Sequence, residues 1–475
     1  MAEVTDLYDE QKVVDETFRD HLATMDDEGK RLWVYPKKPK GKFTNYRTLV
    51  SYFLLLTLIG GPFVKIGGQP LLLFDILQRR FIIFGQVFWP QDFFLFVIGM
   101  ITSVVFIILF TVVFGRIFCG WICPQTIFME GVFRKVEYWI EGDYMAQKKL
   151  DKMPWNREKI IKKTSKQLIF IAISAVIMHT FMAYLVGIEK MQEIITEGPL
   201  ENTGGFIAMI VMTGLFYGVF SRLREQVCTT ICPYGRLQGV LLDRQSIVVV
   251  YDHERGEVRS KFRKNEDRDA VGKGDCIDCK QCVYVCPTGI DIRNGTQLEC
   301  VNCTACIDAC DSIMDRLGKP KGLVRYASEQ NITDKLPFVF SGRMTAYTTV
   351  LVVLIGVLVS LLIIRSDFET TILRTPGMMF QEREDGMITN LYQLKMVNKT
   401  NIAMDIRLEL MEPKGAIEMI GSSLILEKQG IGEGAFFVAI NPEDLEKMSS
   451  KISIGVYSGN ELVETVKTKF LGPAR

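Results

Sequence analysis

The chain has 475 residues, of which 48% are hydrophobic, and 56 lysines and arginines almost balance 55 aspartates and glutamates. A length of this order suits two or three domains. The net charge of +1 gives no overall electrostatic attraction to nucleic acid, so we expect no nucleic-acid partner. The composition is compatible with a membrane protein, and the arrangement of long apolar stretches along the chain supports one.

Five long stretches are apolar and almost free of charge, and each is sufficient to cross a hydrocarbon core of about 30 Å. Because a backbone that faces lipid must satisfy its own hydrogen bonds, each stretch is predicted to be a helix. The stretches are Thr48–Ile66, Phe93–Phe114, Leu168–Ile188, Gly205–Phe220 and Ala346–Ile364. Between the first two, Gln69 to Pro90 is broken by Arg79 and Arg80 and is predicted to be interfacial or re-entrant.

Lysine and arginine are unevenly divided among the loops. They are abundant before the first apolar stretch and between the second and third, whereas the loop between the third and fourth has only Lys190. The positive-inside rule then places the N-terminus and the second loop in the cytoplasm. Five crossings put the C-terminal segment, residues 366–475, on the opposite side.

Four cysteines form two copies of a C-x3-C-P pattern, just after the second and fourth apolar stretches. They are Cys119, Cys123, Cys228 and Cys232. The copies indicate a parallel internal repeat that would bring two cysteine pairs to one membrane depth. Soft thiolates bind Cu(I), zinc or iron–sulfur clusters, and a dithiol also exchanges electrons with a disulfide. Burial as small side chains is the remaining alternative, and the spacing leaves all of these open.

The third apolar stretch contains Met178, His179 and Met182, with the only histidine of any predicted span. A histidine beside methionines could ligate copper, and ionisable groups inside membranes are often functional. Methionine also fills packing gaps, and histidine also bonds a neighbouring helix. Copper ligation by these three residues is therefore one of two open interpretations.

The other eight cysteines lie in two runs that each read C-x2-C-x2-C-x3-C. In the bacterial two-cluster pattern, the fourth cysteine of each run ligates the other [4Fe–4S] cluster. One cluster is assigned to Cys276, Cys279, Cys282 and Cys310, and the other to Cys300, Cys303, Cys306 and Cys286. Zinc sites use pairs with longer spacers, and disulfides need an oxidising compartment. The runs therefore predict a ferredoxin-like domain that transfers electrons.

The C-terminal segment alternates between apolar and polar residues in short stretches bounded by turn signals. This pattern predicts an antiparallel β-sandwich of the immunoglobulin-like class. The predicted strands include Ile402–Leu410, Ser423–Leu426, Phe436–Ile440 and Lys451–Val456. Residues 366–475 contain no histidine and no cysteine, so a docking or binding module is expected.

The predicted fold is a multi-domain membrane protein. It combines an α-helical bundle of about five transmembrane helices, a cytoplasmic two-cluster ferredoxin-like domain and a C-terminal immunoglobulin-like β-sandwich. The predicted boundaries are an N-terminal segment 1–46, a four-helix membrane region 47–245, a ferredoxin-like domain 246–344, a fifth helix 345–365 and a sandwich 366–475.

These features resemble the cytochrome c oxidase accessory protein family known as CcoG, FixG or RdxA. The resemblance covers nearly the whole chain. Besides the ferredoxin run and the β-rich tail, it is carried by Phe118-Cys119-Gly120-Trp121-Ile122-Cys123-Pro124-Gln125-Thr126 and Cys232-Pro233-Tyr234-Gly235-Arg236-Leu237-Gln238. One departure is Asp311, which stands where a proline is usual and would tend to lower the potential of the nearby cluster.

The resemblance implies a protein of the bacterial inner membrane, with cytoplasmic clusters and a periplasmic C-terminal domain, that helps to mature cbb3-type oxidases. It also implies reduction of Cu(II) to Cu(I), with the C-x3-C-P cysteines as the candidate copper or thiol site. The implied partners are oxidase subunits or copper-delivery proteins, and a cytoplasmic ferredoxin or flavoprotein as electron donor. Two alternatives are a quinol-oxidising conduit, like the membrane subunit of periplasmic nitrate reductase systems, and a non-redox assembly scaffold.

Overall fold

The computed structural model describes residues 24–473 except 26–27, 29, 77–79, 264–265, 269, 367, 378, 401, 422–423, 429 and 446. The first half of the predicted N-terminal segment and Ser423 of a predicted strand thus lie outside the described residues. The chain divides into two compact units. The membrane–ferredoxin unit comprises residues up to 62 and residues 97–356, and the β unit comprises residues 63–96 and 357–475.

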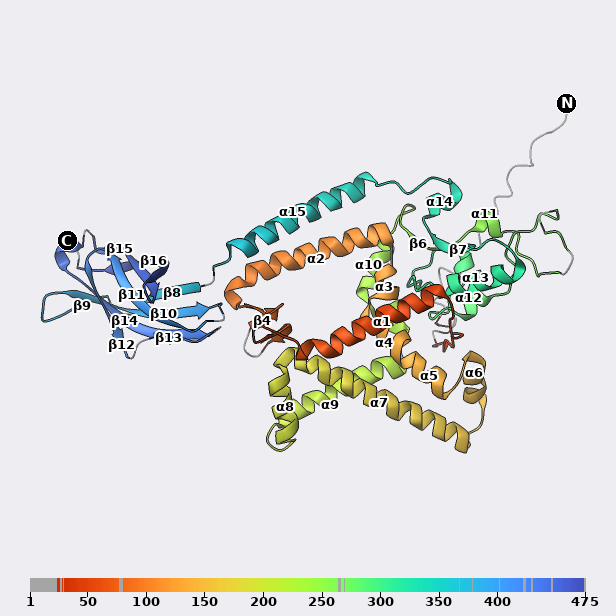
Figure 1. Ribbon diagram of the computed structural model, residues 1–475, viewed down its shortest axis with the longest axis horizontal. Helices are drawn as coiled ribbons and strands as arrows, with labels where there is room; N and C mark the ends of the chain where they lie inside the picture. Colours follow the sequence, from red (N-terminus) through yellow and green to blue (C-terminus); the bar gives the residue numbers. More distant parts are fainter. Residues whose placement is uncertain are drawn as a thin grey trace, which may run out of the picture. The chain divides into compact units, whose positions relative to one another are not determined.

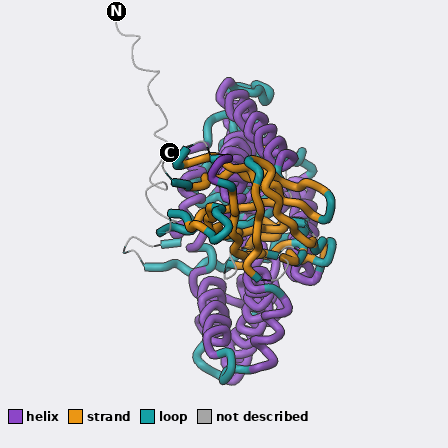
Figure 2. The backbone as a smooth tube through the Cα atoms, turned by 90° about the vertical axis from the view of Figure 1, so that its left-hand side faces the viewer, coloured by secondary structure: helices purple, strands orange, loops and turns teal. Residues whose placement is uncertain are grey.

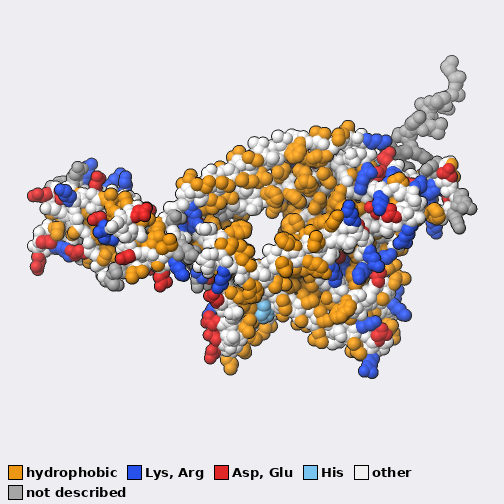
Figure 3. Space-filling model, in the orientation of Figure 1, with side chains coloured by type: hydrophobic (Ala, Val, Ile, Leu, Met, Phe, Trp, Pro, Cys, Tyr) orange, Lys and Arg blue, Asp and Glu red, His pale blue; other side chains and the backbone are white. Residues whose placement is uncertain are grey.

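Five helices of the described chain are long and apolar enough to cross a membrane, which confirms the five predicted spans. They are α1 (Lys42–Gly60), α2 (Phe93–Phe114), α7 (Arg157–Val186), α9 (Thr203–Gly218) and α15 (Gly342–Ile364) (Figure 1). The most apolar window of α7 is 39% buried, against 6–17% for the others, so α7 is the most enclosed of the five. We call the predicted ferredoxin-like domain, residues 246–344, the cysteine-rich domain. Within the membrane–ferredoxin unit, Figure 3 shows apolar side chains over the helices, and lysines and arginines around this domain.

Helix α1 begins at Lys42, six residues before the predicted span. The reason is Asp308, a buried residue of α13 (Ala305–Leu317) in the cysteine-rich domain. Its carboxylate accepts hydrogen bonds from the backbone N–H groups of Phe43 (3.1 Å) and Thr44 (2.7 Å). These N–H groups have no partner within a helix, so the carboxylate acts as a cap. The polar first turn of α1 can therefore be helical, because Asp308 of the cysteine-rich domain accepts hydrogen bonds from its backbone N–H groups.

Short helices connect the spans within the membrane–ferredoxin unit. They are α3 (Ile117–Trp121), α4 (Pro124–Phe128), α5 (Arg134–Ile140), α6 (Tyr144–Lys152), α8 (Ile188–Glu197) and α10 (Pro233–Leu241). The cysteine-rich domain contains the antiparallel pair β6 (Val248–Tyr251) and β7 (Val324–Ala327), with α11 (His253–Gly256), α12 (Gln281–Tyr284), α13 and α14 (Glu329–Thr333). Its core joins Val249, Tyr251, Ile307, Met314 and Leu323 to several of the cysteines.

The C-terminal part of the β unit is a two-sheet antiparallel sandwich, and Figure 2 shows its strands gathered in one body. One sheet has the order β12 (Gly415–Ile420), β14 (Ile431–Ile440), β10 (Ile388–Asn398), β8 (Phe368–Arg374), with β9 (Gln381–Glu382) beside β10. The other has the order β13 (Leu424–Leu426), β11 (Met404–Glu412), β15 (Ser449–Ser458), β16 (Glu461–Leu471). Tyr392, Phe436, Ile454 and Phe470 fill the core between the sheets, which confirms the predicted sandwich.

The segment Gln69 to Pro90 differs from its prediction as an interfacial or re-entrant stretch. It forms a small antiparallel sheet of β3 (Leu72–Asp75), β4 (Arg80–Ile83) and β5 (Gln86–Phe88), preceded by the hairpin β1 (Lys65–Ile66) and β2 (Gln69–Pro70). Leu73, Ile82 and Val87 are buried with Trp89 against Val397 of β10. The apolar side chains of this segment therefore pack on the sandwich, and it belongs to the β unit.

A buried charge cluster fixes this small sheet to the sandwich. Asp92 lies 2.8 Å from Arg365 and 2.7 Å from Lys399, and the side chains of Asp92 and Lys399 are each under 5% exposed. We expect Asp92→Asn to weaken this attachment by about 1.5–3 kcal/mol, because it removes the charge from two hydrogen bonds. Tryptic cleavage after Arg80 should then become about tenfold faster or more, since cleavage follows the population of the opened form.

The matched control is Glu433→Gln, which breaks the exposed pair with Lys395 (2.9 Å) in the same unit. An exposed pair contributes about 1 kcal/mol or less, so its cleavage rate should stay close to that of the unchanged protein. Equal rates for the two variants would refute the role given to Asp92.

Candidate metal centres

The two cysteine runs share an unusual backbone conformation. In the first loop, Asp278 and Lys280 flank the second cysteine with φ of 50° and 55°, and in the second loop Asn302 and Thr304 flank it with φ of 53° and 65°. Left-handed residues other than glycine cost about 1–3 kcal/mol each and persist only where the surroundings fix them. Alternation of this kind turns successive N–H groups toward one point and creates a concave site for negative charge. The two loops thus share one backbone conformation around the second cysteine of each run.

Each loop forms the wall of a cavity. The first cavity is lined by Cys276, Cys279, Cys282 and Cys310, together with Tyr251, Arg293 and apolar residues. The second is lined by Cys286, Cys300, Cys303 and Cys306, and Cys282 reaches it as well. Helix α13 carries both Cys306 and Cys310, so a single helix supplies thiols to both cavities. The assignment of cluster ligands remains a prediction, and the grouping of the thiols around two cavities supports it.

The donor set of these cavities fits an iron–sulfur group better than a single metal ion. All eight cysteines are free of disulfides. Four sulfurs at 2.3 Å from one zinc ion would lie within about 4 Å of one another. No group of three or more histidine, cysteine, aspartate or glutamate side chains among the described residues is placed to hold one metal ion. Four thiols that line a common cavity suit a group that itself contains several iron atoms.

Burial favours the neutral thiol form of these cysteines when no metal is bound. It raises the pKa of Cys282 to about 12, and likewise that of Cys300 to about 12. Metal ligation requires the thiolate, so binding must release these protons. The first cavity also has Arg293, whose charge lowers the pKa of Cys282 in opposition to burial.

The C-x3-C-P motifs have equivalent local structures in the two copies. Cys123 precedes α4 and Cys232 precedes α10, and in both cases proline occupies the first turn. The two cysteines have similar extended backbones, with φ, ψ of −57°, 126° and −68°, 112°. Proline suits the first helical position because its missing N–H needs no partner there. Each motif therefore presents one cysteine before the helix break and one directly at it.

The four cysteines of these motifs converge in space. Burial is the main cause that raises the pKa of Cys228 to about 12, and the neighbouring charges of Cys123, Cys119 and Cys232 raise it further. Burial likewise raises the pKa of Cys119 to about 11, with Cys123 and Cys232 among its neighbours. We call this group, Cys119, Cys123, Cys228 and Cys232, the four-cysteine site. The predicted repeat thus brings its two pairs together.

The four-cysteine site touches the second ferredoxin loop. Cys119 and Cys228 pack with Val301 and Cys303 in one apolar cluster. The approach is close, because a Cβ atom on Gly120 would lie 2.5 Å from the carbonyl oxygen of Val301. Only glycine avoids that clash. Cysteines near the C-terminal ends of α2 and α9 therefore lie against the wall of the second cavity.

Arg116 links both motifs to this loop from a buried position. Its guanidinium donates hydrogen bonds to the Gly235 carbonyl (2.6 Å) and to Oε1 of Gln238 (2.8 Å) in the second motif. It also donates to the carbonyl oxygens of Leu298 and Cys300, which lead into the second run. The Cys119 thiol donates to the same Oε1 of Gln238 at 3.1 Å. A single cation thus fixes the positions of all three segments.

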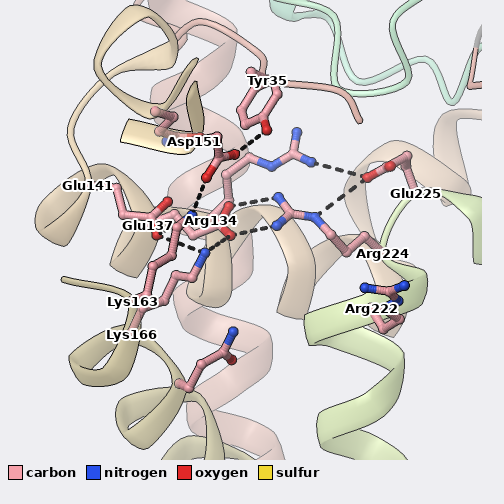
Figure 4. Close-up of polar contacts among 12 residues, drawn as sticks. Tyr35, Arg134, Glu137, Glu141, Asp151, Lys163, Lys166, Arg222, Arg224 and Glu225 are labelled. Carbon is pink, nitrogen blue, oxygen red and sulfur yellow. Dashed lines mark hydrogen bonds and ion pairs between the residues drawn. The ribbon is translucent and has the colours of Figure 1, made fainter. Parts of the chain in front are cut away.

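A buried ion network supports the second motif (Figure 4). Arg224, four residues before Cys228, has a φ of 54° and donates two hydrogen bonds to Glu137 of α5, at 2.5 and 2.7 Å. Burial raises the pKa of Glu137, but the charge and hydrogen bonds of Arg224 outweigh it and leave that pKa below its usual value. Because a strained residue needs surroundings that fix it, this pair positions the turn that leads into the motif.

The network continues on both sides of this pair. Lys166 bridges Glu137 (3.6 Å) and Glu141 (2.9 Å), and Lys163 bridges Glu141 (3.0 Å) and Asp151 (2.6 Å). Asp151 accepts a hydrogen bond from Tyr35 of the N-terminal segment. Helices α5, α6 and α7 are therefore connected through charged groups at the end of the membrane bundle where the four-cysteine site lies.

The structure separates Met178, His179 and Met182 from the cysteine sites. Met182 packs with Ala183, Met191, Ile194 and Met209, from α7, α8 and α9. Nδ1 of His179 lies 2.6 Å from the Ala175 carbonyl of its own helix. Copper ligation by these three residues remains a prediction, and their described contacts are those of packing and of a local hydrogen bond.

Three domain models match the chain. A 4Fe-4S dicluster domain matches residues 223–329, a 4Fe-4S binding domain matches residues 96–144, and an IG-like fold at the C-terminal of FixG matches residues 358–473. The protein RdxB of Cereibacter sphaeroides is 34% identical over 80% of this chain and 82% of its own length. The RdxA protein of the same organism is 35% identical over 77% and 79%.

The chain belongs to the FixG/RdxA family. The nitrogen fixation protein FixG of Rhizobium meliloti is also 35% identical, over 67% of this chain and 61% of its own length, so the match spans about three fifths of that relative. Membership establishes a membrane iron–sulfur protein of this family with ferredoxin-type domains and an immunoglobulin-like C-terminal fold.

Several residues that position the four-cysteine site or the helices around the cysteine-rich domain were given no role by sequence reasoning. Gln238 closes the motif that begins at Cys232, and its place in α10, six residues beyond that cysteine, could have identified it. Glu137 is one of six acids in a loop whose lysines and arginines were used only to set orientation, so its pairing was not considered. Asp308 could not be found from sequence, because its partner is the first turn of α1, 264 residues away.

Proposed function

We propose that this protein is a membrane-bound oxidoreductase that reduces Cu(II) to Cu(I) for the maturation of a cbb3-type oxidase. The observation that supports it most directly is the contact of the four-cysteine site with the second ferredoxin loop at Val301 and Cys303. Two ferredoxin-type cavities and a further set of thiols form a continuous series. Such a series suits electron transfer better than three unrelated sites would.

The chain's own residues define the order of the series. Cys282 lines both ferredoxin cavities, and α13 joins them through Cys306 and Cys310. Cys119 and Cys228 then contact the loop of the second cavity. An iron–sulfur cluster, when bound, gives or takes one electron at a time, which matches the single electron that converts Cu(II) to Cu(I).

The balance of the reaction requires an electron donor. Each Cu(II) ion gains one electron, and the protein loses one, which a reduced ferredoxin or flavoprotein restores. We place the N-terminus and the cysteine-rich domain in the cytoplasm of the inner membrane, and the immunoglobulin-like domain in the periplasm, where it would dock oxidase subunits or copper-delivery proteins.

Replacement of one cysteine from each motif tests this proposal. Full-length protein is reduced without oxygen and mixed with Cu(II) and a Cu(I)-specific chelator, and the rate of Cu(I) formation is recorded. We expect Cys119→Ser and Cys228→Ser to abolish most of this rate while the ferredoxin-type magnetic resonance signals remain. Normal copper reduction by both variants would show that the four-cysteine site is not the exit.

Quinol oxidation is a second candidate because of a cavity of about 420 Å³ beside the first turns of α1. Arg47 in its wall donates a hydrogen bond to the Cys303 carbonyl at 2.9 Å, so the cavity adjoins the second ferredoxin loop. Its wall contains Lys38, Lys40, Lys135 and Tyr138. Reduction of the oxidised protein by a ubiquinol or menaquinol would favour this candidate, and failure of both quinols would dismiss it.

A further inference from the structure

We propose that Cys119, Cys123, Cys228 and Cys232 together hold a third [4Fe–4S] cluster, so that the two membrane motifs form one cofactor site. The inference rests on the proposed electron-transfer function and names what the exit site contains. It differs from a copper site, because copper is then the substrate that accepts the electron and the cysteines are ligands of iron.

The number and symmetry of the ligands support a cubane. A [4Fe–4S] cluster takes four thiolates, one for each iron. The site offers four, two from each copy of the repeat, and the two copies have matching backbones at Cys123 and Cys232. A parallel repeat that supplies equivalent pairs suits a group with equivalent corners.

The spacing of the thiols supports it as well. A single Cu(I) or zinc ion draws its sulfur ligands close together, whereas no described group of cysteines is placed to hold one metal ion. The eight ferredoxin cysteines share this property with the four-cysteine site. All four thiols of the site are free, and each is only partly exposed. Like the ferredoxin cysteines, the four are therefore free thiols that are not arranged around a single ion.

The surroundings suit a buried anionic cluster. Backbone N–H groups of Gln125 and Thr126 donate toward the Cys123 sulfur. The charge of Arg116 acts on both Cys119 and Cys228. Apolar neighbours Val285, Val301 and Ala305 complete the wall on the ferredoxin side. Hydrogen bonds to sulfur, nearby positive charge and limited exposure to solvent are the features by which proteins adjust iron–sulfur potentials.

The two matching 4Fe-4S domain models divide the four-cysteine site between them, with one pair of cysteines in each. The 4Fe-4S binding model matches residues 96–144, where Cys119 and Cys123 are the only cysteines. Two cysteines cannot complete a cubane. The dicluster model on residues 223–329 contains Cys228 and Cys232 in addition to the eight that two clusters use. Convergence of the two pairs joins Cys119 and Cys123 to the two surplus cysteines of the second segment and completes a set of four.

The test is metal analysis of the full-length protein purified without oxygen. We expect about twelve irons and twelve sulfides per chain, four of each for every cluster. The variant Cys119→Ala with Cys228→Ala should lose about four irons and keep the two ferredoxin-type magnetic resonance signals. The complementary variant, Cys123→Ala with Cys232→Ala, should behave identically. As a matched control, Cys276→Ala should also lose about four irons but alter the ferredoxin signals instead.

The outcomes separate this inference from the proposed function. About eight irons in the unchanged protein, with the same number in both double variants, would overturn the third cluster. Copper reduction that still required the four cysteines would leave the proposed function standing in that case. Conversely, twelve irons that fall to eight in the double variants would support the cluster even if no Cu(I) were formed, and the copper function alone would fail.

Discussion

Replacement of Glu137 by glutamine is expected to lower the free energy of unfolding of the membrane–ferredoxin unit by about 3–5 kcal/mol. Glu137 compensates the buried charge of Arg224 through two hydrogen bonds, and only 3% of either side chain is exposed. Glutamine keeps the shape but removes the hydrogen-bonded carboxylate, so the buried guanidinium keeps only the more distant Glu225, at 3.7 Å. Thermal unfolding of the detergent-solubilised protein measures the effect, as a fall of several degrees in the midpoint.

A control and a rescue make this prediction specific. Glu158→Gln breaks the pair with Lys162 at the start of α7, where the carboxylate side chain is 56% exposed, so the midpoint should barely change. Adding Arg224→Met to Glu137→Gln removes the poorly compensated buried cation and should recover part of the lost stability. The role of the pair is refuted if Glu137→Gln and Glu158→Gln unfold at the same temperature.

Replacement of Gly120 by alanine is expected to slow copper reduction about 10- to 100-fold, as displacements near 1 Å can do. The new Cβ would lie 2.5 Å from the Val301 oxygen and 2.8 Å from the Asn302 oxygen, both of them backbone atoms. The ferredoxin loop would therefore move away from Cys119. The measurement is the rate of Cu(I) formation by reduced protein, with the ferredoxin-type signals recorded on the same sample.

Gly214→Ala is the matched control for this substitution. Gly214 lies in α9, and a Cβ atom there would meet nothing within 4 Å. Alanine also favours helix over glycine, so this variant should reduce copper at the normal rate. Full activity of Gly120→Ala would contradict the view that contact between the motif and the loop carries the electron.

The sequence was most informative where one physical constraint dominates. A membrane span needs about twenty apolar residues, so all five helices could be predicted from hydropathy alone. Cluster ligation imposes short spacers on cysteines, and the two runs in the cysteine-rich domain display them. The FixG/RdxA resemblance was similarly secure, because the segments around Cys119 and Cys232 are long enough to be distinctive.

Prediction from sequence was weaker where the partner is distant in the chain. The sheet β3–β5 was missed because its apolar residues are buried by Val397 of another segment. Strands β8, β10, β12 and β16 were not among those named from sequence, and in β10 the residues are buried continuously at both ends and do not alternate there. Convergence of the two C-x3-C-P motifs was expected from the repeat, but their contact with Val301 depends on tertiary packing.

The measurement that tests the central claim most directly is an electron count without oxygen. Fully reduced protein is titrated with Cu(II) in the presence of a Cu(I)-specific chelator, while the visible absorbance of the protein and the amount of Cu(I) are followed together. We predict that one Cu(I) forms for every electron that the protein loses, and that Cys282→Ala, which alters the wall of both ferredoxin cavities, stores fewer electrons and forms correspondingly less Cu(I). Protein that stays reduced while Cu(II) remains unchanged would contradict the account.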